Sequence, residues 1–381
     1  MQRSITDIGA AVVGTGFIGA VHVEALRRLG LPVYGVVGSS RTRAAERAAA
    51  LNLPPAYESF EAMLADPRVD VVHITTPNHL HYTQAAAALA AGKHVVCEKP
   101  LAMTSTQTGE LLRLAQATRL VHAVNFNFRF YPICRHLHQL VREGGLGEVR
   151  LVSGYYLQDW LLLDTDWNWR LEPEIGGSLR AVSDIGSHWM DITSYLMGQR
   201  IVSVMADLKT FIPVRQQPLG PVETFASSSG ATTARKITTE DCATILLRFE
   251  NGALGNLTVS QISAGRKNTL EFEIDGSTSA AAWHSEHPDA LWIGHRGRPN
   301  EILPRDPSLL DAEALDGLPA GHNQGFADTF KSLYRAVYRA VAGEGTSEPD
   351  YPTFADGHES MLVCEAVARS AKRGTWEEVA R

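Results

Sequence analysis

The sequence has few cysteines, no long hydrophobic run and no excess of positive charge. Its four cysteines are far apart and form no C-x-x-C pair or Cys/His cluster, which excludes a disulfide-stapled secreted domain and a zinc-ribbon type of site. The longest apolar stretches, such as Ala85–Ala91, are too short to span a bilayer. With 35 basic and 42 acidic residues the net charge is −7, so neither nucleic acid nor a membrane surface is an expected partner.

The amino terminus also lacks a feature that would direct the chain out of the cell. The first residues, MQRSITDI, contain no basic n-region, apolar h-region or small-residue cleavage site, so no signal peptide is visible. Together with the scattered thiols, this predicts a cytoplasmic protein. The length of 381 residues, 44% of them hydrophobic, suffices for two globular domains with large cores.

Residues 1–128 alternate short apolar runs with helical patterns. The predicted strands are Ile8–Val13, Val33–Val37, Val69–Ile74, His94–Cys97 and Leu120–Asn125. The predicted helices are Phe17–Leu29, Arg41–Leu51, Leu80–Ala91 and Ser105–Ala117. Uninterrupted apolar strands that alternate with amphipathic helices are typical of a parallel sheet covered on both faces. We therefore predict an α/β domain over residues 1–128.

Residues 129–381 follow a different pattern, in which strands alternate polar and apolar residues. The predicted strands are Val149–Tyr156, Ala243–Glu250, Ala253–Ser260 and Leu270–Asp275, and the predicted helices are Pro132–Arg142, Phe326–Val341 and Asp356–Lys372. Glu250-Asn251-Gly252 is a hairpin turn of the Asn-Gly type. We predict an α+β domain over 129–381, whose late helices can pack back on the first domain, and an exposed, mobile loop over Ala226–Ala234.

The first motif, Gly14-Thr15-Gly16-Phe17-Ile18-Gly19, fits G-x-G-x-x-G between a predicted strand and a predicted helix. Gly14 permits the tight turn, Gly16 lets a pyrophosphate approach the backbone, and Gly19 lets the helix pack on the strand. The helix amino terminus then faces the negative charge of the phosphates. In this context the motif favours dinucleotide binding over an ordinary glycine turn.

The end of the second predicted strand indicates which nicotinamide cofactor is used. A carboxylate there would bind the ribose hydroxyls of NAD. This chain instead has Ser39, Ser40 and Arg41, which can hold a 2′-phosphate, so NADP is favoured and NAD is the alternative. The competing interpretation is that Arg41 and Arg43 are solvated residues in the first turn of a helix.

Two further motifs follow predicted parallel strands, where an open sheet binds its ligands. The first is Thr75-Thr76-Pro77-Asn78-His79-Leu80-His81, and no third metal ligand stands at a useful spacing from its two histidines. The second is Glu98-Lys99-Pro100. A lysine in a partly dry, charged site can exchange protons with a substrate hydroxyl. The alternative for Lys99 is a surface lysine beside Glu98.

The last motif is Gly176-Gly177-Ser178 followed by Asp184 and His188. Residues at i and i+4 share one face of a helix, and a carboxylate beside an imidazole can form an acid/base couple. A surface ion pair is the competing interpretation, and the preceding glycines favour a functional one.

These motifs, together with Asn125-Phe126-Asn127-Phe128-Arg129, occur in the order found in the Gfo/Idh/MocA oxidoreductase family, which the chain resembles over essentially its whole length. The resemblance implies an amino-terminal Rossmann domain and a carboxy-terminal α+β domain with an open, mainly antiparallel sheet. In the family that sheet often forms the subunit interface, so a homodimer or homotetramer is expected. Family members in the periplasm carry a twin-arginine leader and a tightly held cofactor; without such a leader, a dissociable cofactor is expected here.

The same resemblance implies the chemistry and its residues. Lys99, Asp184 and His188 would be the catalytic trio, which also contacts the substrate, in the oxidation of a secondary hydroxyl of a sugar or polyol. Either Lys99 or His188 would take the hydroxyl proton. The other family-implied contacts are Thr75, Thr76, Pro77, Asn78, His81, Glu98, Lys99 and Asn127 for the cofactor, with Arg129 and His322 for the substrate. No metal is expected.

A tryptophan-rich stretch, Asp159–Arg170, adds substrate candidates that come from the residues themselves. Trp160 and Trp169 can stack on sugar rings while Arg170 bonds to hydroxyls; a packed, partly buried loop is the equal alternative.

Two other functions remain as alternatives. An NAD-dependent glycosidase would oxidise its sugar transiently and eliminate the substituent. A non-catalytic dinucleotide sensor would bind regulatory proteins, but it would have no need of Lys99, Asp184 and His188 together.

Overall fold

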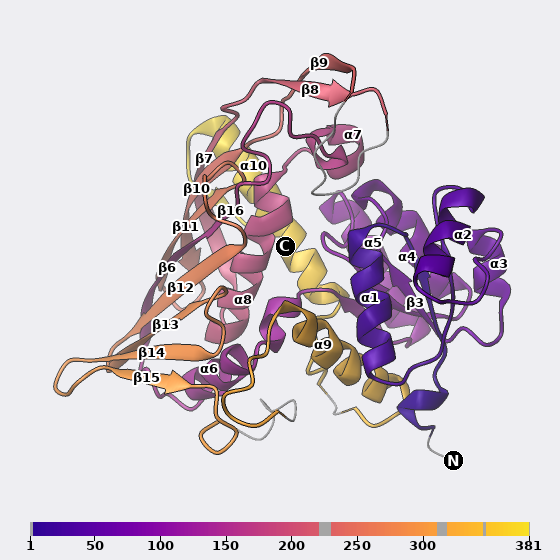
Figure 1. The fold of residues 1–381 in the computed structure, drawn as a ribbon. Coiled ribbons are helices and arrows are strands. Elements are labelled where there is room, and N and C mark those ends of the chain that lie inside the picture. Colours follow the sequence, from indigo (N-terminus) through magenta and orange to yellow (C-terminus); the bar gives the residue numbers. More distant parts are fainter. Residues whose placement is uncertain (1–2, 221–229, 311–317, 346–347, 381) are drawn as a thin grey trace. The chain divides into compact units, whose positions relative to one another are not determined.

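The computed structural model describes residues 3–220, 230–310, 318–345 and 348–380 (Figure 1). Over these residues the chain divides into two compact units. The first consists of Met1–Asn127 and Ala327–Met361, and the second of Phe128–Phe326 and Leu362–Arg381. The two units are therefore not consecutive stretches of chain, because nearly all of the helix α9 and the start of α10 belong to the first.

The first unit contains a parallel sheet in the order β2-β1-β3-β4-β5. Its strands are β1 (Ala10–Val13), β2 (Val33–Val37), β3 (Val71–Ile74), β4 (His94–Cys97) and β5 (His122–Val124). Every residue of β1 and β3 is buried, so both faces of the sheet are covered. The predicted Rossmann-type parallel sheet is confirmed, and each strand lies within two residues of its predicted bounds.

Most helices of the first unit lie where the pattern predicts them, whereas the helix over Phe60–Ala65 was not predicted. The helices are α1 (Phe17–Arg28), α2 (Arg41–Ala50), α3 (Phe60–Ala65), α4 (His81–Ala90), α5 (Ser105–Thr118), α9 (Phe326–Val341) and α10 (Phe354–Arg373), with short 3-10 turns η1 (Ile5–Asp7), η2 (Asn78–Leu80) and η3 (Asn127–Phe130). Polar caps set where several begin: the Ser40 hydroxyl accepts from the Arg43 backbone N–H, and the Thr104 hydroxyl from that of Gln107.

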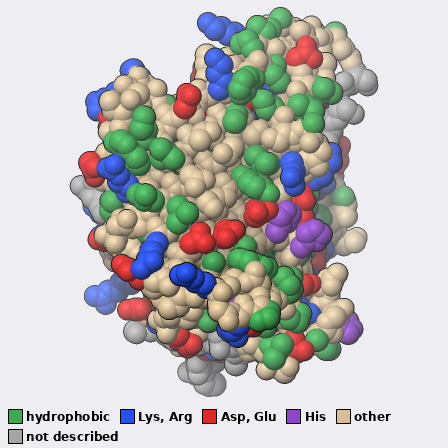
Figure 2. Space-filling view, turned by 90° about the vertical axis from the view of Figure 1, so that its left-hand side faces the viewer, with side chains coloured by type: hydrophobic (Ala, Val, Ile, Leu, Met, Phe, Trp, Pro, Cys, Tyr) green, Lys and Arg blue, Asp and Glu red, His purple; other side chains and the backbone are tan. Residues whose placement is uncertain are grey.

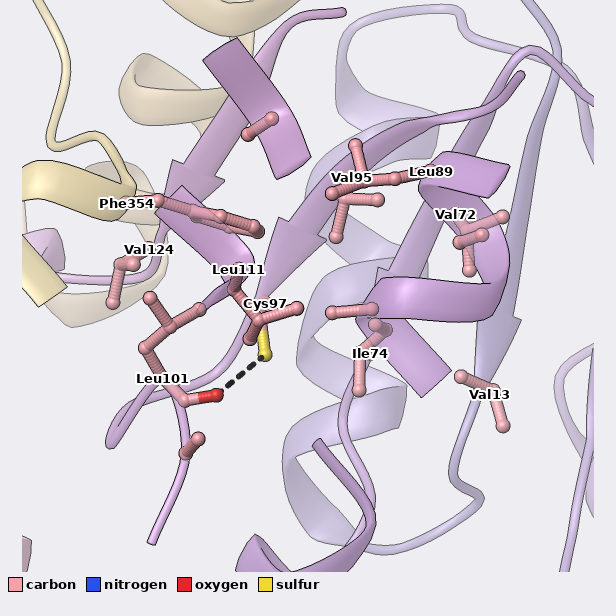
Figure 3. Close-up of a cluster of buried hydrophobic side chains, with 14 of the residues drawn as sticks. Val13, Val72, Ile74, Leu89, Val95, Cys97, Leu101, Leu111, Val124 and Phe354 are labelled. Atoms are coloured by element: carbon pink, nitrogen blue, oxygen red, sulfur yellow. Dashed lines mark hydrogen bonds between the residues drawn. The ribbon is translucent and has the colours of Figure 1, made fainter. Parts of the chain in front are cut away.

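The core of the first unit is a cluster of aliphatic side chains between the sheet and its helices (Figure 3). Val13, Ile74 and Cys97 contribute from three neighbouring strands, and Phe354 from α10. Burial raises the pKa of the Cys97 thiol well above its usual value, so this thiol stays protonated. Cys97 is therefore a packing residue, although it directly precedes Glu98 and Lys99.

The second unit is built on a larger mixed sheet, here called the large sheet, in the order β15-β14-β13-β12-β6-β11-β10-β7-β16. Its strands are β6 (Val149–Leu157), β7 (Ile201–Lys209), β10 (Cys242–Phe249), β11 (Leu254–Ser260), β12 (Thr269–Gly276), β13 (Ser279–His284), β14 (Ala290–His295), β15 (Glu301–Pro304) and β16 (Glu377–Glu378). The β6–β11 pair is parallel and the other pairs are antiparallel. The mainly antiparallel sheet implied by the family resemblance is thus confirmed.

One face of the large sheet packs on helices (Figure 1). The helical segments of this unit are α6 (Pro132–Arg142), α7 (Pro173–Gly176) and α8 (Ser187–Met197), with η4 (Trp169–Leu171) and a π-helical turn η5 (Val182–Gly186). The indole N–H of Trp189 on α8 donates to the Glu271 carbonyl of β12 at 2.8 Å. Along β10 every second side chain is exposed to solvent on the opposite face of the sheet, which is the half-buried pattern of an antiparallel sheet.

Several elements of the second unit are not found by sequence patterns. Strands β7, β13, β14 and β15 are missed because their apolar residues do not stand out from the surrounding sequence. The predicted mobile loop is partly wrong: residues 226–229 lie outside the described residues, but Thr232–Lys236 forms strand β9, which pairs with β8 (Val214–Pro218). In the ranges that the structure describes, no helix is long and apolar enough to cross a membrane.

A buried ion cluster ties the second unit together. The Asp241 carboxylate contacts the guanidinium groups of Arg180 and Arg215, and all three side chains are fully buried. Desolvation acts to raise the Asp241 pKa, but the two arginines and backbone N–H groups outweigh it and hold that pKa below its usual value. Arg215 also donates to the carbonyls of Leu161 and Leu163, and so anchors the tryptophan-rich stretch.

Candidate active site

Four neighbouring parallel strands end in one row. The register pairs Val13 with Ile74, Ile74 with Cys97, and Cys97 with Val124. The residues that follow, Gly14, Thr75, Glu98 and Asn125, therefore lie side by side at the carboxyl edge of the parallel sheet. Parallel α/β sheets bind their ligands at this edge. Motifs far apart in the sequence are thereby brought together within the first unit.

The glycines of the first motif have the three roles that a dinucleotide site requires. Gly14 has φ +108°, and a Cβ there would lie 2.5 Å from the Thr75 carbonyl oxygen; at Gly19 it would lie 2.3 Å from the Gly14 carbonyl. Around a Cβ on Gly16, by contrast, no other described part of the chain lies within 4 Å. Gly16 is the N-cap of α1, and the amino terminus of a helix carries a partial positive charge. This open cradle at a helix amino terminus fits a pyrophosphate. Thr15, Phe17 and Ile18 complete the turn, and Phe17 is half exposed.

The turn after β2 adjoins the glycine motif. A Cβ on Gly38 would lie 3.0 Å from the Thr15 hydroxyl, so Ser39 and Ser40 stand beside the glycine turn. Ser39 and Arg41 are exposed, and the Arg41 guanidinium contacts the Glu58 carboxylate at 3.1 Å on the surface. Ser40 uses its hydroxyl to cap α2.

The Thr75–Asn78 loop is fastened to the glycine turn. The Thr75 hydroxyl lies 3.0 Å from the Val13 carbonyl and 3.1 Å from that of Gly14, and the Thr76 hydroxyl donates to Gln84. Pro77 is half-buried and Asn78 is buried. His81 is fully buried, with its ring nitrogens 2.7 Å from the Pro100 carbonyl and 2.8 Å from the Thr76 carbonyl.

Both ring nitrogens of His81 lie on backbone carbonyls, so His81 joins the Thr75–Asn78 loop to the turn that carries Lys99. Its contact with the cofactor stays a prediction. The sequence predicted the loop from its place after a strand, but it gave no sign that His81 would be buried.

The Glu98-Lys99-Pro100 turn follows β4 directly. Glu98 is buried, and its Oε1 accepts hydrogen bonds from Asn125 Nδ2 at 2.5 Å and from His22 Nε2 at 3.1 Å. Its Oε2 accepts from the Lys99 backbone N–H at 3.3 Å. Lys99 is half-buried, which is the partly dry setting expected for a proton-exchanging lysine. Asn127 is buried, and its carboxamide donates to the Thr329 hydroxyl of α9 at 2.8 Å.

Asp184 lies in the π-helical turn that leads into α8, whereas an α-helix was predicted. Its carboxylate accepts from Arg170 Nε at 3.0 Å and from Gln261 Nε2 at 2.8 Å, so two donors fix its orientation. π-Bulges of this kind are frequent at functional sites. Gln261, on the segment after β11, was not predicted, because a single glutamine outside any motif gives no signal.

His188 is buried on the first turn of α8. Its ring centroid lies 5.1 Å from that of Phe128 and 6.4 Å from that of Tyr156. The Tyr156 hydroxyl donates to Asn268 at 2.6 Å, and burial raises the pKa of this phenol well above its usual value. Tyr156 was not predicted either; its apolar surroundings on β6 made it look like a core residue.

The tryptophan-rich stretch has packing contacts as well as polar ones. Trp160 is half-buried beside Leu161 and donates to Gln158 at 2.8 Å. The Arg170 guanidinium lies 4.4 Å from the ring centre of Trp169, so one arginine contacts both this indole and Asp184. Trp160 thus packs within the loop, and its contact with a substrate stays a prediction.

The two remaining substrate candidates differ in exposure. Arg129 forms a two-pronged ion pair with Asp191 of α8, at 2.8 and 2.5 Å, and lies over the Tyr195 ring. These contacts make it an anchor for α8 within the second unit. His322 is exposed, and its backbone carbonyl accepts from Arg305. Among the described residues no group of three or more His, Cys, Asp or Glu side chains is arranged to hold a metal ion.

A glycine cradle at the edge of a parallel sheet, joined in one chain to a unit with a large mixed sheet, defines a two-domain dinucleotide-binding oxidoreductase. Residues 8–126 match the oxidoreductase family with an NAD-binding Rossmann fold, and residues 134–282 match the GFO/IDH/MocA carboxy-terminal domain. The chain belongs to this GFO/IDH/MocA family.

Individual relatives match along nearly the whole chain. The levoglucosan dehydrogenase of Pseudarthrobacter phenanthrenivorans is 30% identical over 389 residues, 98% of each chain. A solved structure of levoglucosan dehydrogenase in complex with NADH and L-sorbose has a TM-score of 0.88, with 30% identity over 98% of this chain and 99% of that one. An inositol dehydrogenase homologue from Azotobacter vinelandii, complexed with NAD+, also has a TM-score of 0.88, at 26% identity over 99% and 98% of the two chains.

The glycine cradle leads to a first prediction. Gly16→Ala places a methyl group in open space with φ −74°, so the variant should fold normally but bind cofactor about tenfold or more weakly. Gly19→Ala, the matched control, forces a methyl group against the Gly14 carbonyl and should lower the melting temperature instead. Cofactor titration followed by nucleotide fluorescence, and thermal denaturation, measure the two effects. Equal cofactor affinity in wild type and Gly16→Ala would contradict the cradle.

Proposed function

We propose that the protein transfers hydride between a secondary hydroxyl of a sugar, polyol or sugar derivative and a nicotinamide cofactor. The observation that carries this proposal is the row of strand ends, which brings the glycine cradle, the Thr75–Asn78 loop and the Lys99 turn to one edge of the first unit. The relatives that match over the whole chain include a levoglucosan dehydrogenase and an inositol dehydrogenase homologue, which supports a sugar or polyol as substrate.

The residues have separable tasks in this reaction. When bound, the nicotinamide supplies the hydride acceptor. Removal of the hydroxyl proton falls to Lys99, on the first unit, or to His188, on the second. Asp184, held by Arg170 and Gln261, supplies a fixed negative charge on the same helical segment as His188. Trp169 and Arg170 offer an indole face and a guanidinium to a hydroxyl-rich ring.

Two observations on the cofactor point in opposite directions. The turn after β2 has no carboxylate and presents Ser39 and Arg41 to solvent, which favours NADP. The solved relatives contain NADH or NAD+, which favours NAD. The exposed Arg41–Glu58 ion pair contributes about 0–1 kcal/mol, so Arg41 can leave Glu58 for a phosphate at little cost.

We also propose that the exposed face of the large sheet joins copies of this chain. Leu246 of β10 lies opposite Met205 of β7, and Leu254 of β11 lies opposite Leu151 of β6, and these side chains are 37–53% exposed. Figure 2, which views the left-hand side of Figure 1, shows hydrophobic side chains interspersed with charged ones on this side. An apolar face of this kind on paired strands is typical of a protein–protein interface.

The reaction is tested with a panel of sugars, anhydrosugars and inositols, by following reduced-cofactor absorbance with NAD and with NADP. At least one compound should reduce the cofactor, and Lys99→Ala should slow that turnover about 10²–10⁴-fold while cofactor affinity stays the same. Unchanged turnover in Lys99→Ala would remove Lys99 from proton transfer. Release of an aglycone without net cofactor reduction would replace this function by the glycosidase, and cofactor binding without any turnover by the sensor.

The cofactor choice is tested by a pair of variants with opposite expected effects. If Arg41 binds the 2′-phosphate, Arg41→Ala should weaken NADP binding about tenfold, because a hydrogen bond to a charged group is worth about 1.5–3 kcal/mol. Glu58→Gln removes its competitor and should strengthen NADP binding, and neither change should alter NAD affinity. Isothermal titration with both nucleotides gives the four affinities. Parallel changes for NAD and NADP would show that Arg41 does not discriminate between them.

The sheet interface is tested by analytical ultracentrifugation. Leu246→Glu puts a charge in the apolar face and should weaken self-association by about 100-fold or more, about 2.7 kcal/mol. Leu309→Glu, at a leucine exposed to a similar extent outside the sheet, should leave the oligomer intact. A wild-type protein that sediments as a monomer would overturn the proposal.

A further inference from the structure

A chain of buried polar side chains runs through the first unit and ends at Glu98. Tyr338 Oη lies 3.1 Å from His73 Nε2, His73 Nδ1 lies 3.0 Å from His22 Nδ1, and His22 Nε2 lies 3.1 Å from Glu98 Oε1. The two histidines and the tyrosine are fully buried, and Glu98 is 7% exposed. The chain links α9, β3 and α1 to the turn that carries Lys99. His22, His73 and Tyr338 belong to no motif of the cofactor or substrate site.

The hydrogen atoms of this chain can be assigned from its geometry. A neutral imidazole has one N–H donor and one acceptor nitrogen. If Glu98 is a carboxylate, His22 must donate from Nε2 and accept at Nδ1. His73 then donates from Nδ1 and accepts at Nε2, and the Tyr338 hydroxyl donates to it. Every hydrogen bond therefore points toward Glu98.

Hydrogen bonds in the opposite direction, away from Glu98, would require Glu98 to be neutral. They would need a proton on Glu98 and a change of tautomer in both imidazole rings. Two other donors oppose this, because the Lys99 backbone N–H can only donate and the Asn125 amide is oriented with Nδ2 toward Glu98, so both donate to the Glu98 carboxylate. The Tyr334 hydroxyl, 3.4 Å from Asn125 Oδ1, supports the orientation of that amide.

Burial shifts the pKa values of several groups along the chain toward their neutral forms. It lowers the pKa of His73 well below its usual value and also lowers the pKa of His81. Burial raises the pKa of the Cys97 thiol and of the Tyr334 and Tyr338 phenols well above their usual values.

We infer that His22, His73 and Tyr338 are positioning residues that keep Glu98 as a carboxylate in one orientation and, through it, set the turn that carries Lys99. The link to Lys99 is its backbone N–H, which donates to the same carboxylate. The chain as oriented does not carry the substrate proton away from Glu98, because His22 Nε2 already holds the hydrogen that it donates to that carboxylate. Proton movement in the other direction would leave a buried tyrosinate at Tyr338. The consequence for catalysis rests on the proposed function; the direction of the chain does not.

The direction is tested without substrate, by nitrogen-15 NMR of histidine-labelled full-length protein. His22 should be the Nε2–H tautomer and His73 the Nδ1–H tautomer, which is the less common form of a free imidazole, and His73 should stay neutral between about pH 6 and 8. Assignment uses single His→Gln variants at each position. An Nε2–H tautomer at His73, or a charged His73 ring in this pH range, would overturn the inference whatever the enzyme's activity.

The effect on catalysis is tested by two variants of His22 that differ in where they put an amide. Glutamine places its N–H close to the position of Nε2 and keeps the donor to Glu98, whereas asparagine places it near Nδ1 and loses that donor. His22→Asn should lower kcat about tenfold or more and move the acid limb of the kcat profile up by about one pH unit, with little change in KM. His22→Gln should restore both.

The outcomes separate the two hypotheses. Equal losses in both variants with an unshifted pH profile would reduce the chain to a structural role and overturn the positioning inference. A wild-type protein that oxidises no compound of the panel, but has the expected tautomers, would contradict the proposed function and leave the chain's direction intact. If His22→Asn does not fold, the wild-type NMR spectrum still decides the direction.

Discussion

The parallel register of β1, β3, β4 and β5 is the constraint on which the candidate site depends. Backbone hydrogen bonds hold it beyond the strand ends: the Thr75 N–H donates to the Val13 carbonyl at 2.8 Å, and the Glu98 N–H to the Ile74 carbonyl at 2.9 Å. A slip of one residue would reverse the faces of a strand and carry Glu98 into the apolar core. The burial of both sheet faces opposes such a slip. The apolar core shown in Figure 3 therefore also fixes the site at the carboxyl edge of the sheet.

A single buried carboxylate has a comparable role in the second unit. Asp241 binds Arg180, which stands four residues before Asp184 in the chain. It also binds Arg215, which anchors the tryptophan-rich stretch through the Leu161 and Leu163 carbonyls. Removing one partner of such a buried pair typically costs about 3–5 kcal/mol, because the other charge is left uncompensated. The orientation of Asp184 and Arg170 thus depends on charges that lie deeper in the same unit.

The first unit was predicted from sequence almost completely, and the second only in part. The strands around Val13, Ile74 and Cys97 are short, apolar apart from His73 and His94, and bounded by turn residues, which gives a clear local signal. The strands β13–β15 mix glycine, alanine and polar residues and are stabilised by pairing with neighbours, so no local pattern marks them. Gln261 was missed because a single glutamine outside any motif gives no signal, and Tyr156 because its neighbours on β6 made it look like a core residue.

What the sequence determined by itself was the class of protein: the alternation of strands and helices, the glycine turn and five ordered motifs point to a dinucleotide-binding oxidoreductase of the GFO/IDH/MocA family. The tertiary structure alone decided which contacts those residues make within the chain. It enclosed His81 between two carbonyls, tied Arg129 to Asp191, and placed His22 and His73 behind Glu98. Motif spacing records positions along the chain, whereas burial and hydrogen-bond direction depend on residues that are distant in sequence and become neighbours only on folding.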